Sequence, residues 1–240
     1  EKIMNEQQII AQASSGDLGV NAQHLRDLIQ TKKKSVFVDI GVRSGMSSGI
    51  MGIRSKENGN KVYGVDVTWN NLIHGLIEDA DYSQLTGDSS TIGKYADLDD
   101  LKSIAVLFID SLHVKQQVLC ELFYWASRVK KGGSIVFHDS HWAQGQYAVI
   151  NGKSWPRVDE AICEFFGLDT IGDYEDDNIK VTCYPESYGM TFVKLKKKIK
   201  PPALDWDTIF KDRNELIAQY WNEGNVGDKT IELEMSYEAD

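Results

Sequence analysis

Cysteine is scarce in this sequence, and the little that occurs is scattered. The chain has three cysteines among its 240 residues and no CxxC pair. Disulfide frameworks and zinc sites need several cysteines at close or regular spacings, so we expect neither. We interpret Cys120, Cys163 and Cys183 as reduced thiols that pack in or near a core.

Long apolar runs are also missing. No stretch approaches the ~18 apolar residues that would cross a bilayer, and residues 1–15 lack the apolar centre of a secretion signal. We therefore expect a cytoplasmic protein without a membrane partner. Hydrophobic residues nevertheless make up 42% of the chain, which is enough to bury a substantial core.

Positive charge is in short supply. The net charge is −10, and residues 201–240 carry ten acidic against three basic side chains. A nearly neutral body with an acidic tail does not attract polyanions, so we do not expect a nucleic-acid partner. Proline is rare too, and the pair Pro201-Pro202 marks the clearest boundary. It divides the chain into a domain at 1–200 and a helical and acidic extension at 201–240.

Within the domain, short apolar runs alternate with segments of helical period. The runs at 35–40, 61–67, 82–86, 104–109 and 134–137 are predicted strands, and helices are predicted at 22–30, 45–56, 112–129 and 158–166. This alternation indicates an α/β doubly wound sheet. Two further strands, at 179–184 and 190–195, are separated only by a short turn, so they must pair antiparallel. We predict a mostly parallel, Rossmann-like sheet of seven strands that ends in an antiparallel hairpin.

A glycine turn follows the first predicted strand. Gly41 and Gly45 bound the turn, and Asp39 stands at the carboxyl end of the strand, where open α/β sheets bind ligands. Gly41 can take a positive φ and let the backbone approach a ligand, and Gly45 permits close passage where a helix begins. Dinucleotide-binding folds use GxGxxG instead. The GxxxG spacing suits a methionine and ribose moiety without a pyrophosphate.

Acidic residues also end the second and third predicted strands. Asp66 is placed to accept both hydroxyls of a ribose, and Trp69 to cover an adenine face. Asp88, next to Ser89, is placed to accept from the adenine amino group. Any one of these acids is equally well explained as a helix cap or turn former. Three acids at the ends of three successive strands, together with the glycine turn, favour a shared cofactor crevice.

A second polar group follows the fourth and fifth predicted strands. Asp110 and His113 are spaced i and i+3, as on one face of a first helical turn, and His138 and Asp139 end the next strand. In one interpretation His113 is a general base, since histidine titrates near neutral pH. In a compatible one, Asp110 and Asp139 bind Mg²⁺, which orients a hydroxyl and lowers its pKa. The alternative is that Asp110 only caps a helix and His138 is a satisfied strand-end residue.

In their order along the chain, these residues resemble the motifs of class I S-adenosylmethionine-dependent methyltransferases, and most of all the macrocin and mycinamicin type of sugar O-methyltransferase. The resemblance extends over roughly residues 35–195. It rests on Asp39-x-Gly41-xxx-Gly45, Asp66, Gly87-Asp88-Ser89, the segment from Phe108 to His113 and the segment from Gly132 to Asp139.

The resemblance implies an enzyme that uses S-adenosylmethionine to methylate a hydroxyl of a sugar or another small metabolite, such as a capsule, lipopolysaccharide or natural-product glycoside. It also implies Asp110 and Asp139 as metal ligands and His113 as base. His138 stands where the family often has a second acid. Mg²⁺ prefers oxygen ligands, so this difference leaves Mg²⁺, Mn²⁺ with His138 as a ligand, or a metal-free site open.

Three rival functions stay open to different degrees. One is methyl transfer to a nitrogen or phosphate-group acceptor, and another is a non-catalytic cofactor-binding protein. The third is a dinucleotide-dependent oxidoreductase, against which the GxxxG spacing and the closing hairpin argue. The presence of Asp110, His113 and Asp139 argues against a decayed site.

Two segments were assigned less specifically. Trp142, Tyr147 and Trp155 lie in a long glycine-bearing segment, where they would stack on a sugar, form a lid or simply pack on the surface. After Pro202, apolar residues recur at helical spacing, which predicts a helix docked on the body or on a second subunit of a homo-oligomer. Residues 225–240 are acidic and expected to be loose.

Overall fold

One mixed sheet runs through the domain. We describe a computed structural model, in which residues 3–69, 72–73, 75–95, 99–141, 148–150 and 153–222 are placed. The eight strands of the sheet follow the order β3-β2-β1-β4-β5-β10-β9-β8. The parallel part consists of β1 (Val36–Ile40), β2 (Lys61–Asp66), β3 (Tyr82–Thr86), β4 (Ile104–Ile109) and β5 (Val129–His138).

The antiparallel end of the sheet confirms the predicted hairpin. Strand β10 (Met190–Leu195) lies between β5 and β9 (Ile179–Tyr184) and is antiparallel to both. A two-residue edge strand that the sequence did not predict, β8 (Tyr174–Glu175), pairs with β9 and brings the count from seven to eight. A separate two-stranded sheet joins β6 (Ala148–Ile150) to β7 (Lys153–Trp155).

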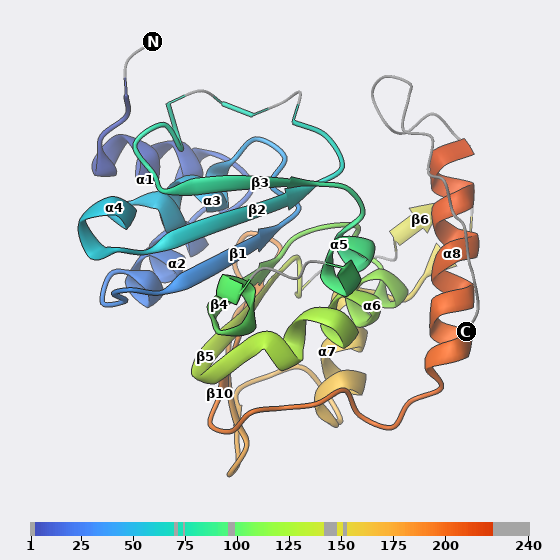
Figure 1. Cartoon of the computed structure of the whole chain (residues 1–240). Coiled ribbons are helices and arrows are strands. Elements are labelled where there is room, and N and C mark those ends of the chain that lie inside the picture. Colours follow the sequence, from blue (N-terminus) through green and yellow to red (C-terminus); the bar gives the residue numbers. More distant parts are fainter. Residues whose placement is uncertain are drawn as a thin grey trace.

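Helices cover both faces of the sheet, as a doubly wound fold requires (Figure 1). Alternate residues of β4 show the two layers: Val106 and Phe108 pack with the N-terminal helices, whereas Leu107 and Ile109 pack with α6 and α7. The first layer contains α1 (Glu6–Ser15), α2 (Asn21–Ile29), α3 (Met46–Gly52) and α4 (Ser55–Asn58). The second contains α5 (Ser89–Tyr95), α6 (Lys115–Trp125) and α7 (Val158–Phe166), with 3₁₀ turns at Asp99–Lys102 and Ala126–Arg128.

Several predicted element boundaries need correction. The helix expected at 45–56 is broken, because Ile53 leaves the helical conformation and Arg54 takes a φ of 53°. The helix expected from Leu112 begins only at Lys115, because Val114 is extended. The fifth strand, predicted at 134–137, already begins at Val129, and it is irregular where Gly132 has a φ of 78° and the register with β4 shifts.

The extension after Pro202 forms α8 (Trp206–Asn222), which stands along the side of the domain next to α6 (Figure 1). An aromatic cluster joins the two helices, with the ring centroids of Phe123 and Trp206 4.7 Å apart and those of Phe123 and Phe210 5.2 Å apart. The docked helix therefore has the apolar face that the sequence predicted.

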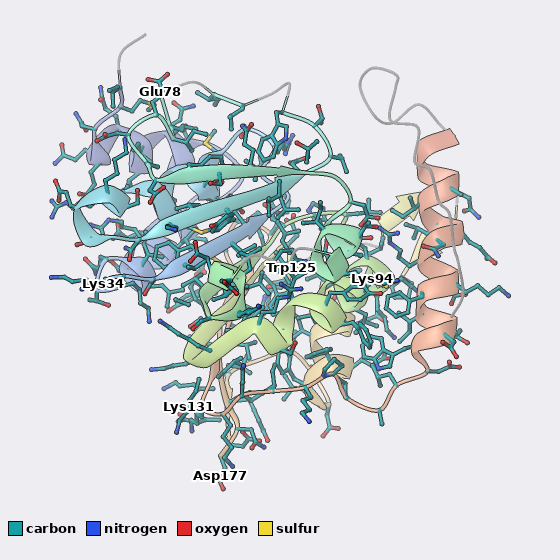
Figure 2. The ribbon with its side chains drawn as sticks, viewed as in Figure 1. Lys34, Glu78, Lys94, Trp125, Lys131 and Asp177 are labelled. Carbon is teal, nitrogen blue, oxygen red and sulfur yellow. The ribbon has the colours of Figure 1, made fainter. Side chains whose placement is uncertain are left out.

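Charged and apolar side chains are segregated as expected for a folded domain. Figure 2 shows Trp125 inside the structure, while Lys34, Glu78, Lys131 and Asp177 lie at its periphery. Among the helices of the described residues, none combines the length and the apolar character that a membrane crossing would need.

Replacing Leu107 tests the core between β4 and α6. Leu107 is fully buried, so Leu107→Ala should lower the free energy of unfolding by about 2–5 kcal/mol, because it leaves a cavity. Tyr174→Ala, on the exposed edge strand β8, is the control and should change it by less than about 0.5 kcal/mol. Urea unfolding measures both, and equal effects of the two variants would contradict the assignment of this core.

Candidate functional site

A cavity of about 640 Å³ opens at the carboxyl ends of β1, β4 and β5. Ligand sites in open α/β sheets lie at this edge, and the volume falls within the range of small-molecule pockets. The cavity brings the glycine turn together with the acids and histidines that follow β4 and β5. Its lining includes Asp17, Leu18, Gly41, Val42, Arg43, Ser44, Met46, Ser47, Asp110, Ser111, His113, His138, Asp139 and Tyr188.

The glycine turn is packed against the chain that follows β4. Gly41 has a φ of 84°, and a Cβ built on it would lie 2.1 Å from the carbonyl oxygen of Asp110. Any side chain at Gly41 would therefore collide with the backbone of Asp110. Gly45, with a φ of 87°, is the N-cap of α3, where a Cβ would meet Leu72 at 2.6 Å. The two glycines thus allow the turn to approach the second polar group directly.

Asp39 stands near the carboxyl end of β1, as predicted. Its side chain is fully buried and does not line the cavity. Instead, its carboxylate accepts hydrogen bonds from the hydroxyls of Ser47 and Ser48, at the start of α3. Burial raises the pKa of Asp39 to about 7, although these two hydrogen bonds lower it. Asp39 therefore fastens the start of α3 to β1, and its assignment to the cofactor site stays a prediction.

Asp66 lies beside the glycine turn, as predicted. Its Oδ2 accepts from the backbone N–H of Arg43 at 2.7 Å and its Oδ1 from that of Thr68 at 3.1 Å. The acid that ends β2 is therefore bonded directly to a residue that lines the cavity. Trp69 follows, and its indole N–H donates to the hydroxyl of Thr86 at the end of β3.

Asp88 and Ser89 belong to a different cluster. Neither is among the described residues that line the cavity. Asp88 accepts from the backbone N–H of Ser90, as a cap of α5 does, and forms an ion pair with Arg213 of α8. Ser89 donates to the buried carboxylate of Glu121 on α6. The predicted crevice thus brings Asp66 to the glycine turn but leaves Asp88 and Ser89 turned towards α6 and α8.

Asp110, His113 and Asp139 form a compact cluster inside the cavity. The Nε2 atom of His113 lies 3.1 Å from Oδ1 of Asp110 and 2.8 Å from Oδ2 of Asp139. One ligand atom from each of the three residues lies within 4.8 Å of the others, as in a metal site. Asp139 has a φ of 53°, which is unusual for a residue other than glycine and marks a constrained position.

His138 supports this cluster from the core. It is 1% exposed, and its Nδ1 lies 3.3 Å from Asp110 and 3.4 Å from Asp139, at the same carboxylate oxygens that face His113. The explanation that Asp110 merely caps α6 is wrong, since the N-cap of α6 is Val114. The segment that carries Asp110 and His113 is not helical, yet it brings the two side chains together as the spacing suggested.

The cluster has the electrostatics of two carboxylates balanced by two imidazolium groups. Burial lowers the pKa of His113 and of His138, but hydrogen bonds to Asp110 and Asp139 outweigh burial and raise the pKa of each histidine to about 10. Burial raises the pKa of the two carboxyl groups, and the histidines reverse this and hold the pKa of both below the usual value. A divalent cation at the carboxylates would supply the same charge balance.

Some of the lining residues were missed by the sequence analysis. Asp17 comes from the connection between α1 and α2 and pairs with Arg43, with both side chains largely exposed. Tyr188, in the turn between β9 and β10, is 60% exposed and has a φ of 66°. No motif marks these loop positions, and only the fold brings them to the cavity. Among the earlier expectations, Trp142 and Tyr147, the side chain of Trp155 and residues 225–240 lie outside the described residues.

Comparison with known proteins agrees with this geometry. Residues 38–140 match the family model described as "Methyltransferase domain". The match covers less than half of the chain but includes the glycine turn and the whole acid–histidine cluster. A search of curated protein sequences gives no significant match.

Three solved structures illustrate the likeness in fold. The MycE methyltransferase from the mycinamycin biosynthetic pathway, in complex with Mg, SAH and mycinamycin VI, is 16% identical, with a TM-score of 0.52 over 85% of this chain and 59% of that chain. CalS11, a TDP-rhamnose 3'-O-methyltransferase of calicheamicin biosynthesis, is 15% identical, with a TM-score of 0.51 over 79% and 81%. A candidate rRNA methylase from Clostridium thermocellum is 11% identical, with a TM-score of 0.50 over 83% and 100%.

These comparisons establish the fold of a class I methyltransferase, similar to that of sugar O-methyltransferases. The chain spans about three fifths of the length of the MycE chains. Because enzymes that act on a sugar and a candidate rRNA methylase both share the fold, the fold does not select the methyl acceptor.

Asp39→Asn tests the buried carboxyl beneath the turn. The pKa of Asp39 is about 7 in the folded state against an ordinary value of 3.8, so Asp39 binds its proton more tightly in the folded state. The stability that this proton supplies is complete below about pH 4 and is lost as the pH rises through about 7. As the pH rises through this range, the free energy of unfolding of Asp39→Asn should therefore increase by on the order of 4 kcal/mol relative to that of the wild type. Above this range the difference between the two proteins should stay constant.

Urea unfolding of both proteins at about pH 4, 6 and 8 measures this difference. Asp177→Asn, at an exposed position, serves as the matched control and should show no such trend. A difference between Asp39→Asn and wild type that stays constant with pH would rule out the raised pKa.

Proposed function

We propose that this chain is an S-adenosylmethionine-dependent O-methyltransferase that acts on a sugar or another small hydroxylated metabolite. One observation carries the proposal: the glycine turn and the cluster of Asp110, His113 and Asp139 line the same cavity. A turn suited to the cofactor and a group suited to activate a hydroxyl are thereby placed side by side.

The cofactor would lie along the turn and beside β2. Gly41 lets the turn lie directly against the backbone of Asp110, and the residues from Gly41 to Ser44 line the cavity along which the cofactor would lie. The carboxylate of Asp66 is held in place by two backbone N–H groups, and it retains acceptor capacity for the ribose hydroxyls. Asp39 supports the turn from beneath through Ser47 and Ser48.

The hydroxyl of the acceptor would lie at His113. Methyl transfer needs in-line alignment of the hydroxyl with the methyl group and removal of the hydroxyl proton as the new bond forms. The Nε2 atom of His113 donates its proton to the two carboxylates, so the opposite ring nitrogen, Nδ1, is the atom we assign to take the hydroxyl proton. The ring would have to be neutral for this step, and a cation at Asp110 and Asp139 would favour the neutral form. Asp110 and Asp139 hold the imidazole ring in place and stabilise its protonated form.

The same residues fit a divalent cation. Carboxylate oxygens of Asp110 and Asp139 converge with imidazole nitrogen, a donor set compatible with Mg²⁺ or Mn²⁺. The two carboxylates would hold the cation, with Nδ1 of His138 at the same oxygens as a third candidate ligand. When bound, the cation would lower the pKa of the acceptor hydroxyl and orient it.

The site favours a hydroxyl acceptor over the rival acceptors. A base beside two carboxylates is suited to remove a proton from the acceptor. A neutral amine can attack before it loses a proton, and an ionised phosphate group has no such proton left, so neither acceptor needs this base. The net charge of −10 also disfavours a polyanionic acceptor such as RNA. The two sugar O-methyltransferases of similar fold support the choice of a sugar as the first acceptor class to test.

Calorimetry with S-adenosylmethionine, S-adenosylhomocysteine and NAD tests the cofactor assignment. We expect the first two to bind and NAD not to bind. Asp66→Ala should weaken binding of S-adenosylhomocysteine about 10- to 100-fold, because a charged acceptor of the ribose hydroxyls is lost. Asp79→Ala, an exposed acid away from the cavity, is the control and should bind normally. Binding of NAD alone would overturn the proposal, and unchanged affinity of Asp66→Ala would overturn the ribose assignment.

His113→Ala tests the assignment of the base. We expect it to reduce turnover about 100-fold or more, while the affinity for S-adenosylhomocysteine stays within about twofold of wild type, since the change leaves the glycine turn and Asp66 intact. Release of S-adenosylhomocysteine measures turnover with TDP-rhamnose, mycinamycin VI and simple methyl glycosides as acceptors, in Mg²⁺, Mn²⁺ or EDTA. His24→Ala, a histidine stacked on Tyr184 outside the cavity, is the matched control. A fully active His113→Ala enzyme would exclude the general-base role.

A further inference from the structure

The C-terminal helix contributes a buried charge to the end of the sheet. Arg213 of α8 is only 8% exposed, and its Nη2 atom forms an ion pair with Oδ2 of Asp88 in which both side chains are about nine-tenths buried. Burying an unpaired guanidinium is strongly unfavourable. The pairing with Asp88 is therefore a built feature of this interface, unlike the exposed pair of Arg43 with Asp17.

A second contact of Arg213 extends into a buried polar network. Its Nε atom donates to Oε1 of Gln117 at 2.8 Å. This contact fixes the orientation of the Gln117 amide, whose Nε2 then donates to Ser89 at 2.9 Å and to Glu121 at 2.8 Å. Both residues that the sequence assigned to the adenine end, Asp88 and Ser89, are thus held through the one guanidinium group.

Asp88 retains the capacity to bind a further donor. Its Oδ1 accepts from the backbone N–H of Ser90 and its Oδ2 from Arg213, whereas a carboxylate offers about four acceptor positions. Asp88 also adjoins the proposed ribose site, because Asp66 is paired with Thr86 across β2 and β3 and its carbonyl accepts from the N–H of Gly87. A nucleoside bound at Asp66 would bring its base towards Asp88.

The same face of α8 also contacts the segment that carries His113. Leu216 is fully buried against Val114, and Leu112 and Ile217 pack on this pair. Arg213, Leu216 and Ile217 are spaced i, i+3 and i+4, so they lie on one side of the helix. One helix face thus touches both the end of β3 and the segment that contains the proposed base.

We propose that Arg213 is a positioning residue for recognition of the cofactor's adenine, an inference that rests on the proposed function. It holds Asp88 so that the free part of the carboxylate accepts from the exocyclic amino group. Docking of α8 is thereby a condition for tight binding of the cofactor, and the C-terminal helix is a working part of the cofactor site.

S-inosylhomocysteine provides a direct probe of this contact. It differs from S-adenosylhomocysteine by a carbonyl oxygen in place of the amino group, so it would present an acceptor to a carboxylate. Wild-type protein should bind S-adenosylhomocysteine about 10- to 100-fold more tightly, the range expected for a hydrogen bond to a charged group. Arg213→Met should reduce this preference to less than about threefold, mainly by weakening the binding of S-adenosylhomocysteine. Calorimetry measures all four affinities.

Two further variants separate positioning from simple support of the fold. Leu216→Ala removes an apolar contact between α8 and Val114 but retains Arg213 with its bonds to Asp88 and Gln117, so it should leave the preference for S-adenosylhomocysteine intact. Arg213→Lys retains the charge but loses the fork that reaches both Asp88 and Gln117. It should show an intermediate preference, and it replaces Arg213→Met if that variant does not fold.

The outcomes distinguish this inference from the proposed function. If the wild type binds neither nucleoside, the cofactor assignment itself fails. If the wild type prefers S-adenosylhomocysteine and the Arg213 variants keep that preference, only the role of Arg213 is overturned. Equal affinity of the wild type for both ligands would also overturn it, because no contact with the amino group would then exist. Tighter binding of S-adenosylhomocysteine by Arg213→Met would overturn it as well, because Arg213 would then obstruct the adenine site.

Discussion

Two carboxylates forced together at neighbouring strand ends are the constraint on which the rest of this site depends. Because β4 and β5 are parallel, Asp110 and Asp139 leave the sheet at the same edge. Like charges so close and so little hydrated would repel strongly without compensation. His113 and His138 supply that compensation, and each contacts both carboxylates. Packing alone gives no reason for this concentration of charge, whereas the proposed binding of a cation or transfer of a proton does.

The glycine turn fixes where this chemistry can act. Gly41 abuts the backbone of Asp110 so closely that no side chain fits between them. A ligand held along the turn would therefore have one end at the acid–histidine cluster, because the turn and the cluster are in direct contact. Asp39 reinforces the arrangement from the core, since its carboxylate ties two serines of α3 to β1. The turn is thus held in place by hydrogen bonds between residues that need not contact a ligand.

The periodicity of apolar residues predicted the fold, and the position of polar residues at strand ends predicted the acid–histidine cluster of the site. The strands at 82–86 and 104–109 and the closing hairpin were predicted to the residue. For 104–109 the reason is that a fully apolar run of strand length leaves few alternatives. Asp110, His113 and Asp139 were predicted to converge for a topological reason. Asp88 was predicted to face the cofactor crevice, yet its main partner is Arg213, 125 residues away. No local pattern reports such a pairing, because it depends on how α8 docks. Helix α1 was missed because its mostly polar sequence hides two buried residues, Ile9 and Ala13.

The choice of methyl acceptor follows from the site and cannot follow from the fold, since a class I methyltransferase sheet serves acceptors of very different size and charge. The residues that face the acceptor side come from connections, such as Asp17 between two helices and Tyr188 between two strands. Connections vary without cost to the sheet, so under the proposed function the specificity for an acceptor can change while the glycine turn and the acid–histidine cluster stay fixed. Helix α8 differs from these loops, because its buried guanidinium is bonded into the end of β3 and cannot be exchanged freely. Under the proposed function, α8 is therefore constrained by its contact with the cofactor side of the site, whereas the loops around the cavity can vary with the acceptor.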